Sequence, residues 1–258
     1  MTTAYALLLE YDGQGFVGWQ RQPNGLSIQE VLEAAASKLA GGAPVAAAIA
    51  GRTDAGVHAE AQVAMIELPQ DLPPLRVAQA LNFHMKPYPV VVRTACIAPA
   101  DWHPRFDALR RRYRYVILNR RARPGLEAGR VWHVPNPLEA SAMAEGAKHL
   151  VGRHDFTSFR ASSCQAKSPL RTLDRLDVRR DGEHIVIEAE ARSFLHHQVR
   201  NMVGTLKLVG DGVWEPGRVA EALEARHRAA AGPTAPPDGL TFMSVEYPQA
   251  IFPQTSDS

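Results

Sequence analysis

The first hundred residues alternate short apolar runs with segments whose apolar residues recur at helical spacing, and this alternation limits the possible folds most strongly. The order is strand, helix, strand, strand, helix, strand, a split βαβ arrangement. The expected elements span residues 4–11, 28–39, 45–50, 61–68, 74–83 and 90–97. Such an order places two helices on one face of an antiparallel sheet, so the sequence predicts an α+β fold.

The second half contains similar elements in a less regular order. We expect strands over residues 113–118, 173–178, 184–191 and 240–247, and helices over 138–150, 195–209 and 216–225. The strands at 173–178 and 184–191 are expected to form a hairpin around Asp181 and Gly182, and the polar tail after Pro248 is expected to be frayed. Each half then holds at least two helices and about four strands. We therefore predict two ferredoxin-like (RRM-like) halves with antiparallel sheets and flanking helices, residues 1–102 and 103–258, although no sequence repeat marks a duplication.

Composition excludes several classes of protein. With 45% hydrophobic and 22% charged residues, the 258-residue chain is neither wholly disordered, collagen-like nor a coiled coil. No apolar run approaches the roughly 18 residues that span a bilayer, and residues 1–10 lack the pattern of a secretory signal. Cys96 and Cys164 lie far apart, which disfavours a disulfide framework or a cysteine zinc site. We expect a cytoplasmic protein.

Positive charge is concentrated in one block. The whole chain has a net charge of +2, yet residues 103–130 hold nine arginines and two acidic residues. Arginine forms flat bidentate contacts with phosphate and stacks on bases. A concentrated basic stripe is typical of nucleic-acid binders, although it also fits a solvated face of an arginine-rich chain.

The segment GRTDAGVH, residues 51–58, lies between two expected strands and contains two glycines. Loops on a rigid scaffold often carry catalytic groups. Arg52 is two residues from Asp54, and a nearby guanidinium favours the ionised form of a carboxylate, which can act as nucleophile or base. The same spacing also fits a turn in which Asp54 caps the backbone and pairs with Arg52.

Two other segments have alternative interpretations. Tyr113 and Tyr115 share one face of an expected strand, and that face is either a stacking surface or core. His196 and Arg200 share a face of the helix expected over 195–209, which either meets Asp54 or RNA or is an ordinary polar first turn. His196 and His197 are adjacent, so they would point in different directions from a helix and would not bind one metal.

Several strings resemble, in order, the tRNA-modifying pseudouridine synthases of the TruA family. The main one is GRTDAGVHA, and the others are YDGQGFVGWQRQ, SIQEVLE, RRYRYVI, HDFTSFR, FLHHQVRNMVG and the GL before the last strand. The resemblance covers nearly the whole chain. It implies isomerisation of uridine to pseudouridine at positions 38, 39 and 40 of the tRNA anticodon stem-loop. It also implies a homodimer whose RNA lies across a basic cleft, with no cofactor and no metal.

The resemblance assigns residue roles as well. Asp54 matches the family's aspartate nucleophile, Arg52 its paired arginine and Tyr113 its active-site tyrosine. A carboxylate can attack a sugar carbon or C6 of uracil, or help to expel the base, and the sequence does not distinguish these routes. We expect further substrate contacts at Arg110, Arg111, Arg112, Arg114, His58, His196, Arg200 and Leu240.

Two other functions compete with this one. A glycosyl hydrolase acting through Asp54 usually needs a second carboxylate, and nothing distinguishes the nearest ones, Glu60 and Glu67. A non-catalytic RNA-binding protein needs only the basic block and makes no demand on Asp54.

Overall fold

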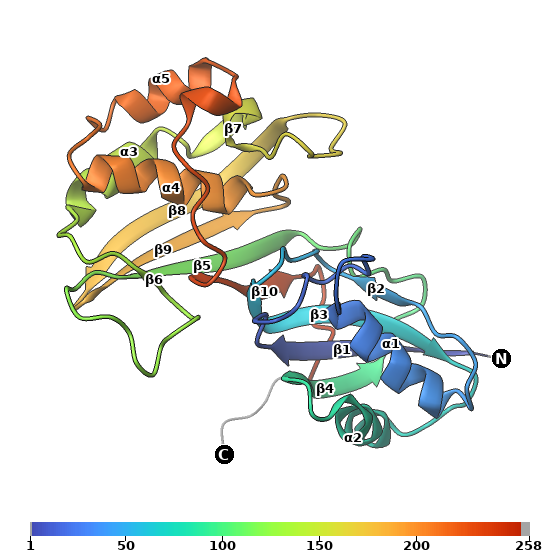
Figure 1. Ribbon diagram of the computed structural model, residues 1–258. Coiled ribbons are helices and arrows are strands. Elements are labelled where there is room, and N and C mark those ends of the chain that lie inside the picture. The colour runs from blue at the N-terminus through green and yellow to red at the C-terminus, as the bar shows by residue number, and fades with distance from the viewer. Residues whose placement is uncertain (1, 254–258) are drawn as a thin grey trace. The chain divides into compact units, whose positions relative to one another are not determined.

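The computed structural model describes residues 2–253. The chain divides into two compact units, unit 1 with residues Met1–Leu109 and Phe242–Ser258, and unit 2 with residues Arg110–Thr241 (Figure 1). The last strand, β10 (Leu240–Glu246), begins in unit 2 and ends in unit 1. The predicted halves, 1–102 and 103–258, do not include this return of the chain to unit 1.

Unit 1 has the element order that the sequence predicts. Its elements are β1 (Thr3–Tyr11), α1 (Ile28–Leu39), β2 (Ala47–Ile49), β3 (His58–Leu68), α2 (Pro74–Met85) and β4 (Val90–Ile97). The strand order is β4-β1-β3-β10, and β2 also pairs with β3. Strand β1 is antiparallel to β3 and to β4, as β2 is to β3, so the expected antiparallel sheet is confirmed here.

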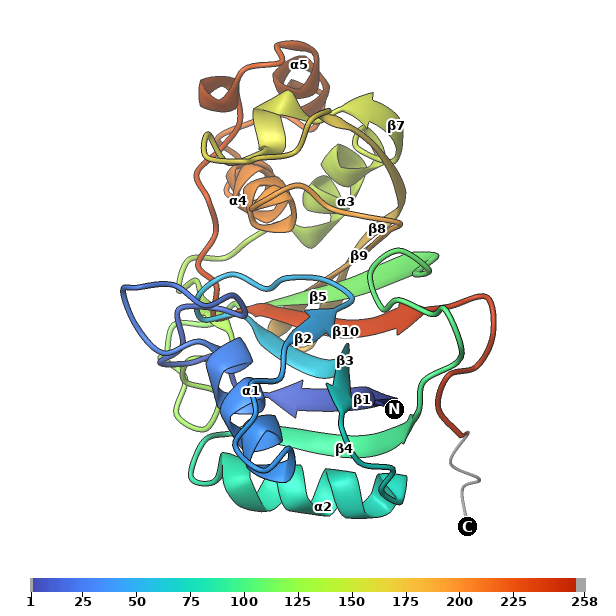
Figure 2. The ribbon, with the colours of Figure 1, turned by 90° about the vertical axis from the view of Figure 1, so that its right-hand side faces the viewer.

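The sheet of unit 1 buries both of its faces. Tyr5, Leu7 and Leu9 of β1 are fully buried, and α1 and α2 pack side by side in this unit (Figure 2). The alternate residues, such as Ala6, belong to a second cluster of side chains, against which Ile251 and Phe252 pack. We expected the tail after Pro248 to be frayed. That expectation is wrong for residues 248–253, because these apolar side chains cover sheet residues, and residues 254–258 lie outside the described part.

Unit 2 contains further strands and three helices. Its elements are β5 (Arg110–Leu118), β6 (Trp132–His133), α3 (Ala140–Lys148), β7 (Gly152–Asp155), β8 (Leu170–Asp181), β9 (His184–Ala191), α4 (Gln198–Gly210) and α5 (Arg218–Glu224). The strand order is β5-β9-β8-β7, with β6 parallel to β5. The short strands β6 and β7 were not predicted, because two to four residues are too few to display a periodicity.

The two units are not repeats of each other in element order. Strands β8 and β9 follow one another directly as an antiparallel hairpin, as predicted around Asp181 and Gly182. Unit 1 instead places a helix after β1 and another after β3. The α+β class is therefore confirmed, whereas the two ferredoxin-like halves are not. No helix within residues 2–253 is long and apolar enough to cross a membrane.

Helix α1 begins at a complete capping box. The Glu30 backbone N–H donates to Ser27 Oγ at 3.2 Å, while the Ser27 N–H and hydroxyl donate to the Glu30 carboxylate at 2.9 and 2.8 Å. These bonds lower the pKa of Glu30 below its ordinary value of 4.5. Because the Ile28 and Gln29 N–H groups at the start of α1 donate to the Gly18 and Trp19 carbonyls, the cap also fixes where the preceding loop packs.

We expect Ser27→Ala to lower the free energy of unfolding by about 1 kcal/mol at neutral pH, because the helix loses its cap. The part of that free energy due to ionised Glu30 is present above pH 4.5 and is lost as the pH falls through the lower folded-state pKa. Urea unfolding at neutral pH and in acid checks both points. Glu30→Gln, which keeps an acceptor without a titrating charge, is the control. If acid lowers the free energy of unfolding of Glu30→Gln as much as that of the native chain, ionised Glu30 does not contribute as described.

Candidate functional site

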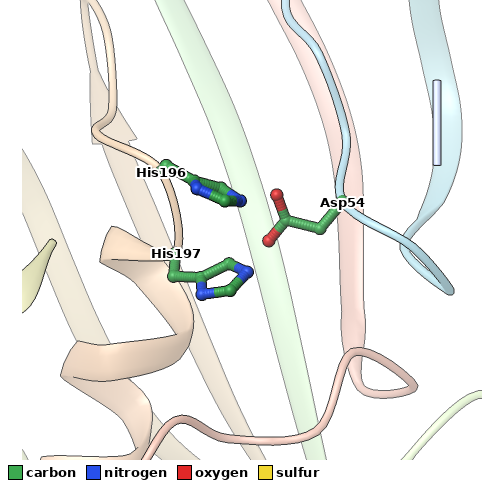
Figure 3. Close-up of side chains that lie close together, drawn as sticks. All are labelled: Asp54, His196 and His197. Atoms are coloured by element: carbon green, nitrogen blue, oxygen red, sulfur yellow. The ribbon is translucent and has the colours of Figure 1, made fainter. Parts of the chain in front are cut away.

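Asp54 lies on a short loop of unit 1 between β2 and β3 (Figure 3). The Val57 N–H donates to the Asp54 carbonyl at 3.1 Å and closes a tight turn, in which Gly56 has φ +77°. Glycine adopts that conformation at no steric cost. The side chain of Asp54 is half-buried, so its carboxylate is held on a defined turn and is still reachable from outside.

The residue before Asp54 is held at both its side chain and its backbone. Thr53 is buried, its Oγ1 lies 2.8 Å from the Tyr11 hydroxyl, and its carbonyl accepts the Trp19 N–H at 3.0 Å. Burial raises the pKa of Tyr11 to about 12, so this phenol stays protonated across the physiological range. Gln62 donates to the Gly51 carbonyl at 2.8 Å. These contacts at Gly51 and Thr53 fix the part of the loop just before Asp54.

A second loop of unit 1, residues 12–27, packs against the Asp54 loop and is called the supporting loop. A Cβ on Gly13 would lie 2.2 Å from the Val57 carbonyl oxygen, and one on Gly18 would lie 2.7 Å from the Thr53 carbonyl oxygen. Gly18 also has φ +102°. Only glycine therefore lets the two backbones approach this closely. This supporting role was not predicted from the sequence, because the spacing of glycines does not identify the backbone that comes close to them.

The other two predicted residues of this loop differ in burial. Arg52 is exposed. His58 is 7% exposed, its Nδ1 accepts the Gly13 N–H at 3.1 Å, and the same atom lies 3.1 Å from Asp12 Oδ1. In unit 1, His58 therefore joins the supporting loop to the start of β3.

Strand β5 of unit 2 presents its predicted residues on two different faces. Tyr113 and Arg111 alternate with Arg110, Arg112 and Arg114, so the two sets point to opposite sides. Tyr113 is half-buried and meets Phe194 edge to face, with ring centroids 5.2 Å apart. Tyr115, the next residue on that face, is fully buried core.

The arginines of β5 have partners within unit 2. Arg111 is 6% exposed and its guanidinium donates to the Arg192 carbonyl. On the opposite face, Arg112 lies 3.2 Å from Glu190 and Arg114 lies 3.0 Å from Glu188. Arg110 approaches Glu190 at 4.0 Å. Three of the nine arginines in the basic block thus lie near two carboxylates of the neighbouring strand β9.

The two histidines lie before α4, not within it (Figure 3). The helix was predicted from residue 195, but it begins at Gln198, because His197 has a left-handed backbone with φ 63°. The argument from helical spacing for His196 and Arg200 is therefore wrong, as is the argument that adjacent histidines diverge. The ring centroids of His196 and His197 lie 4.0 Å apart.

Arg200 and Leu240 belong to a packed segment near the end of unit 2. Arg200 Nε donates to the Ala235 carbonyl at 2.8 Å, and Leu240 is 4% exposed. A Cβ on Gly204 of α4 would lie 1.8 Å from the Pro233 carbonyl oxygen. Buried Asn201 accepts the Thr234 hydroxyl at 2.7 Å. The predicted motif at α4 thus holds residues 231–236 against the helix.

A protein-family model described as tRNA pseudouridine synthase matches residues 8–107 and 147–248, well over half of the chain. The chain belongs to the tRNA pseudouridine synthase family. It is thus a member of a family of isomerases, and the resemblance seen in the sequence is confirmed.

Curated relatives agree with the family model. A protein of Acidiphilium cryptum is 70% identical over 97% of this chain and 98% of its own length. One of Paramagnetospirillum magneticum is 60% identical over 94% of each chain, and one of Gluconobacter oxydans is 53% identical over 96% of this chain and 91% of its own. Each is named tRNA pseudouridine synthase A.

The matched ranges of the tRNA pseudouridine synthase model contain some of the predicted site residues. Asp54, Arg52 and His58 fall in the first range, and His196, Arg200 and Leu240 fall in the second. Residues 108–146, which include Tyr113 and the arginines of β5, lie outside both. Those residues are covered by the relatives, whose similarity extends over nearly the whole chain.

We expect Gly13→Ala to lower the free energy of unfolding by about 1–3 kcal/mol, because its methyl group would overlap the Val57 carbonyl. Hydrogen exchange of the Trp19 and Val57 amides, which hold the Asp54 loop, is expected to speed up more than exchange in unit 2. Gly125→Ala is the matched control, since nothing lies within 4 Å of its Cβ position. Unchanged exchange and an unchanged melting temperature in Gly13→Ala would argue against the close contact.

Proposed function

We propose that this chain isomerises uridine to pseudouridine at positions 38, 39 and/or 40 of the tRNA anticodon stem-loop, with Asp54 as the nucleophile. The observation that carries the proposal is the position of Asp54. It lies in a range matched by the tRNA pseudouridine synthase model, on a loop pinned at Gly51, Thr53 and Val57. Preorganisation of this kind holds a reacting group near its productive geometry.

The reaction is balanced without a co-reactant. The C1′–N1 glycosidic bond breaks, the uracil turns over, and a C1′–C5 bond forms. The proton on C5 is released and N1 gains a proton, so the mass of the RNA is unchanged. A carboxylate can open this sequence by attack on C1′ or on C6, or by assisting departure of the base, and Asp54 serves each route from one position.

Arg52 and Tyr113 complete the proposed catalytic set. The exposed Arg52 guanidinium, two residues from Asp54, would pair with that carboxylate, as the family resemblance implies. Tyr113 is only half-buried, so its ring has surface left for stacking with a base, and its hydroxyl would assist removal of the C5 proton, a general-base role. A paired uridine cannot be reached inside a stem, so the target must be flipped out of its stack.

The proposal includes further features that follow from the family resemblance. The protein would act in the cytoplasm as a homodimer, bind tRNA across a basic cleft, and need neither cofactor nor metal. His58 is buried, so it would act by positioning the Asp54 loop. His196, Arg200 and Leu240 would contact the RNA or support the residues that contact it.

Tritium release from tRNA carrying 5-tritiated uridine tests the reaction directly, because forming the C1′–C5 bond expels the C5 hydrogen. We expect release by the native chain and none above background by Asp54→Ala or Asp54→Asn. Both variants should bind tRNA about as tightly as the native chain, because Asp54 acts on the reacting atoms and not on the phosphates.

Three outcomes would contradict the proposal in different ways. Free uracil among the products would indicate a hydrolase. Equal loss of binding and release in Asp54→Asn would make Asp54 structural. Tight binding of tRNA by a well-folded native chain without any release would leave a non-catalytic RNA-binding protein.

The arginines of β5 give a separate prediction. If Arg112 and Arg114 also contact phosphates, the double variant to Gln lowers the slope of log Kd against log salt concentration by about 1.4–1.8, because each phosphate contact contributes roughly 0.7–0.9. Titrations at several salt concentrations measure this slope. An unchanged slope with a lowered melting temperature would instead mean that these residues serve only to neutralise Glu188 and Glu190.

A further inference from the structure

Phe106 is a large aromatic side chain left open to solvent in unit 1. It lies in the turn that connects β4 to β5, and 69% of its surface is exposed. Exposing a phenylalanine costs free energy that burial would recover. Exposure alone does not identify a partner, because single apolar side chains are common on protein surfaces, so the argument depends on the groups that contact this ring.

The side chains of Arg105 and His103 both lie against the Phe106 ring. The Arg105 guanidinium carbon is 6.0 Å from the centroid of the Phe106 ring, within the range of a cation–π contact. The His103 ring lies on it at a centroid distance of 4.4 Å and an interplanar angle of 34°. An aromatic face beside a guanidinium is an arrangement that suits a nucleotide, since the base stacks on the ring while the guanidinium binds a phosphate.

The turn that carries Phe106 is braced from several directions. The His103 N–H donates to Asp107 Oδ2 at 2.7 Å, and the Asp107 N–H donates to the His103 carbonyl at 3.2 Å. The Arg105 N–H donates to His103 Nδ1 at 3.0 Å. These bonds hold the backbone on both sides of Phe106, so little conformational entropy remains to be lost when a ligand binds.

The turn is also attached to the sheet of unit 1. The Tyr247 hydroxyl donates to the Pro104 carbonyl at 2.8 Å, and the Leu109 N–H donates to the Glu246 carbonyl at 2.8 Å. The Tyr247 ring meets Trp102 edge to face at 5.2 Å. The exposed ring thus stands on a rigid support.

We propose that Phe106 is a base-stacking residue for the RNA substrate, and that Arg105 binds a phosphate next to the stacked nucleotide. The base that it takes is an unpaired one, because only an unpaired base exposes its face to a side chain. The proposal rests on the proposed function and adds an RNA contact outside the set of Asp54, Arg52 and Tyr113.

The chemistry of the turn favours RNA over a protein partner. Its charged side chains are Arg105 and Asp107, and the Asp107 carboxylate already accepts the His103 N–H. A nucleotide brings both a base for the ring and a phosphate for the Arg105 guanidinium that lies over it, whereas an apolar pocket would use the ring alone. An RNA uses both groups.

The test compares Phe106→Leu with Phe83→Leu. Phe83, on α2 of the same unit, has the same exposed fraction of 69% and lies edge-on to His84 with ring centroids 5.2 Å apart, so it is a matched control. We expect Phe106→Leu to weaken tRNA binding about 5- to 150-fold, with an unchanged salt slope, because stacking is lost and no charge is removed. Phe106→Tyr should retain binding, and Phe83→Leu should leave it unchanged.

A second readout detects stacking itself. In Phe106→Trp the new indole should be quenched by tRNA, beyond the change seen with the four native tryptophans, whereas Phe83→Trp should add no quenching. Arg105→Gln should lower the salt slope by about 0.7–0.9, the value of one phosphate contact.

Three results would overturn the proposal. Phe106→Leu binding tRNA as the native chain does would show that the ring is not used. A change in particle mass by light scattering in Phe106→Leu would make the ring a protein contact. No quenching in active Phe106→Trp would exclude stacking. Tritium release by the native chain, run in parallel, separates these results from failure of the proposed function, which would show as no release at all.

Discussion

The position of Asp54 depends on the contact between two loop backbones of unit 1. Gly13 and Gly18 bring the supporting loop so close to residues 53–57 that a methyl group on either would overlap a carbonyl oxygen. The buried Tyr11 hydroxyl and the Trp19 N–H then fix Thr53. Because the first N–H groups of α1 donate to the Gly18 and Trp19 carbonyls, the capping box, the supporting loop and the Asp54 turn are joined by hydrogen bonds.

Charge in unit 2 is organised by the alternation of β5. The residues on one face, Arg111 and Tyr113, are in contact with the segment before α4. Those on the other face sit opposite Glu188 and Glu190 on β9. The basic block seen in the sequence is therefore not a uniform cationic surface, since Arg111 is buried on the face of Tyr113, while Arg110, Arg112 and Arg114 lie near Glu188 and Glu190. Phe106 and Arg105, at the start of the block, belong to neither.

Much of the fold could be predicted from local patterns, and what could not be predicted depends on distant parts of the chain. The strand at 90–97 and the helix at 28–39 follow from apolar periodicity and from a capping box, both of which are local. The start of α4 was misplaced, because the left-handed backbone at His197 leaves no trace in the pattern of apolar residues. The turn around Asp54 was recognisable from its sequence, whereas the glycines and Tyr11 that hold it are separated from it by some forty residues.

The course of β10 makes unit 1 discontinuous in the chain. In topological terms, residues 110–241 are an insertion between the first four strands of unit 1 and the strand β10 that completes its sheet. On the ribosome, the nascent unit 1 must wait for nearly the whole chain before β10, Ile251 and Phe252 can cover its open strand and its second face. Until then an unpaired strand edge and an apolar sheet face are exposed to other chains, a condition typical of aggregation-prone intermediates. The end of synthesis therefore sets when the sheet of unit 1 is completely covered, whereas the contacts that hold Asp54 lie within its first 62 residues.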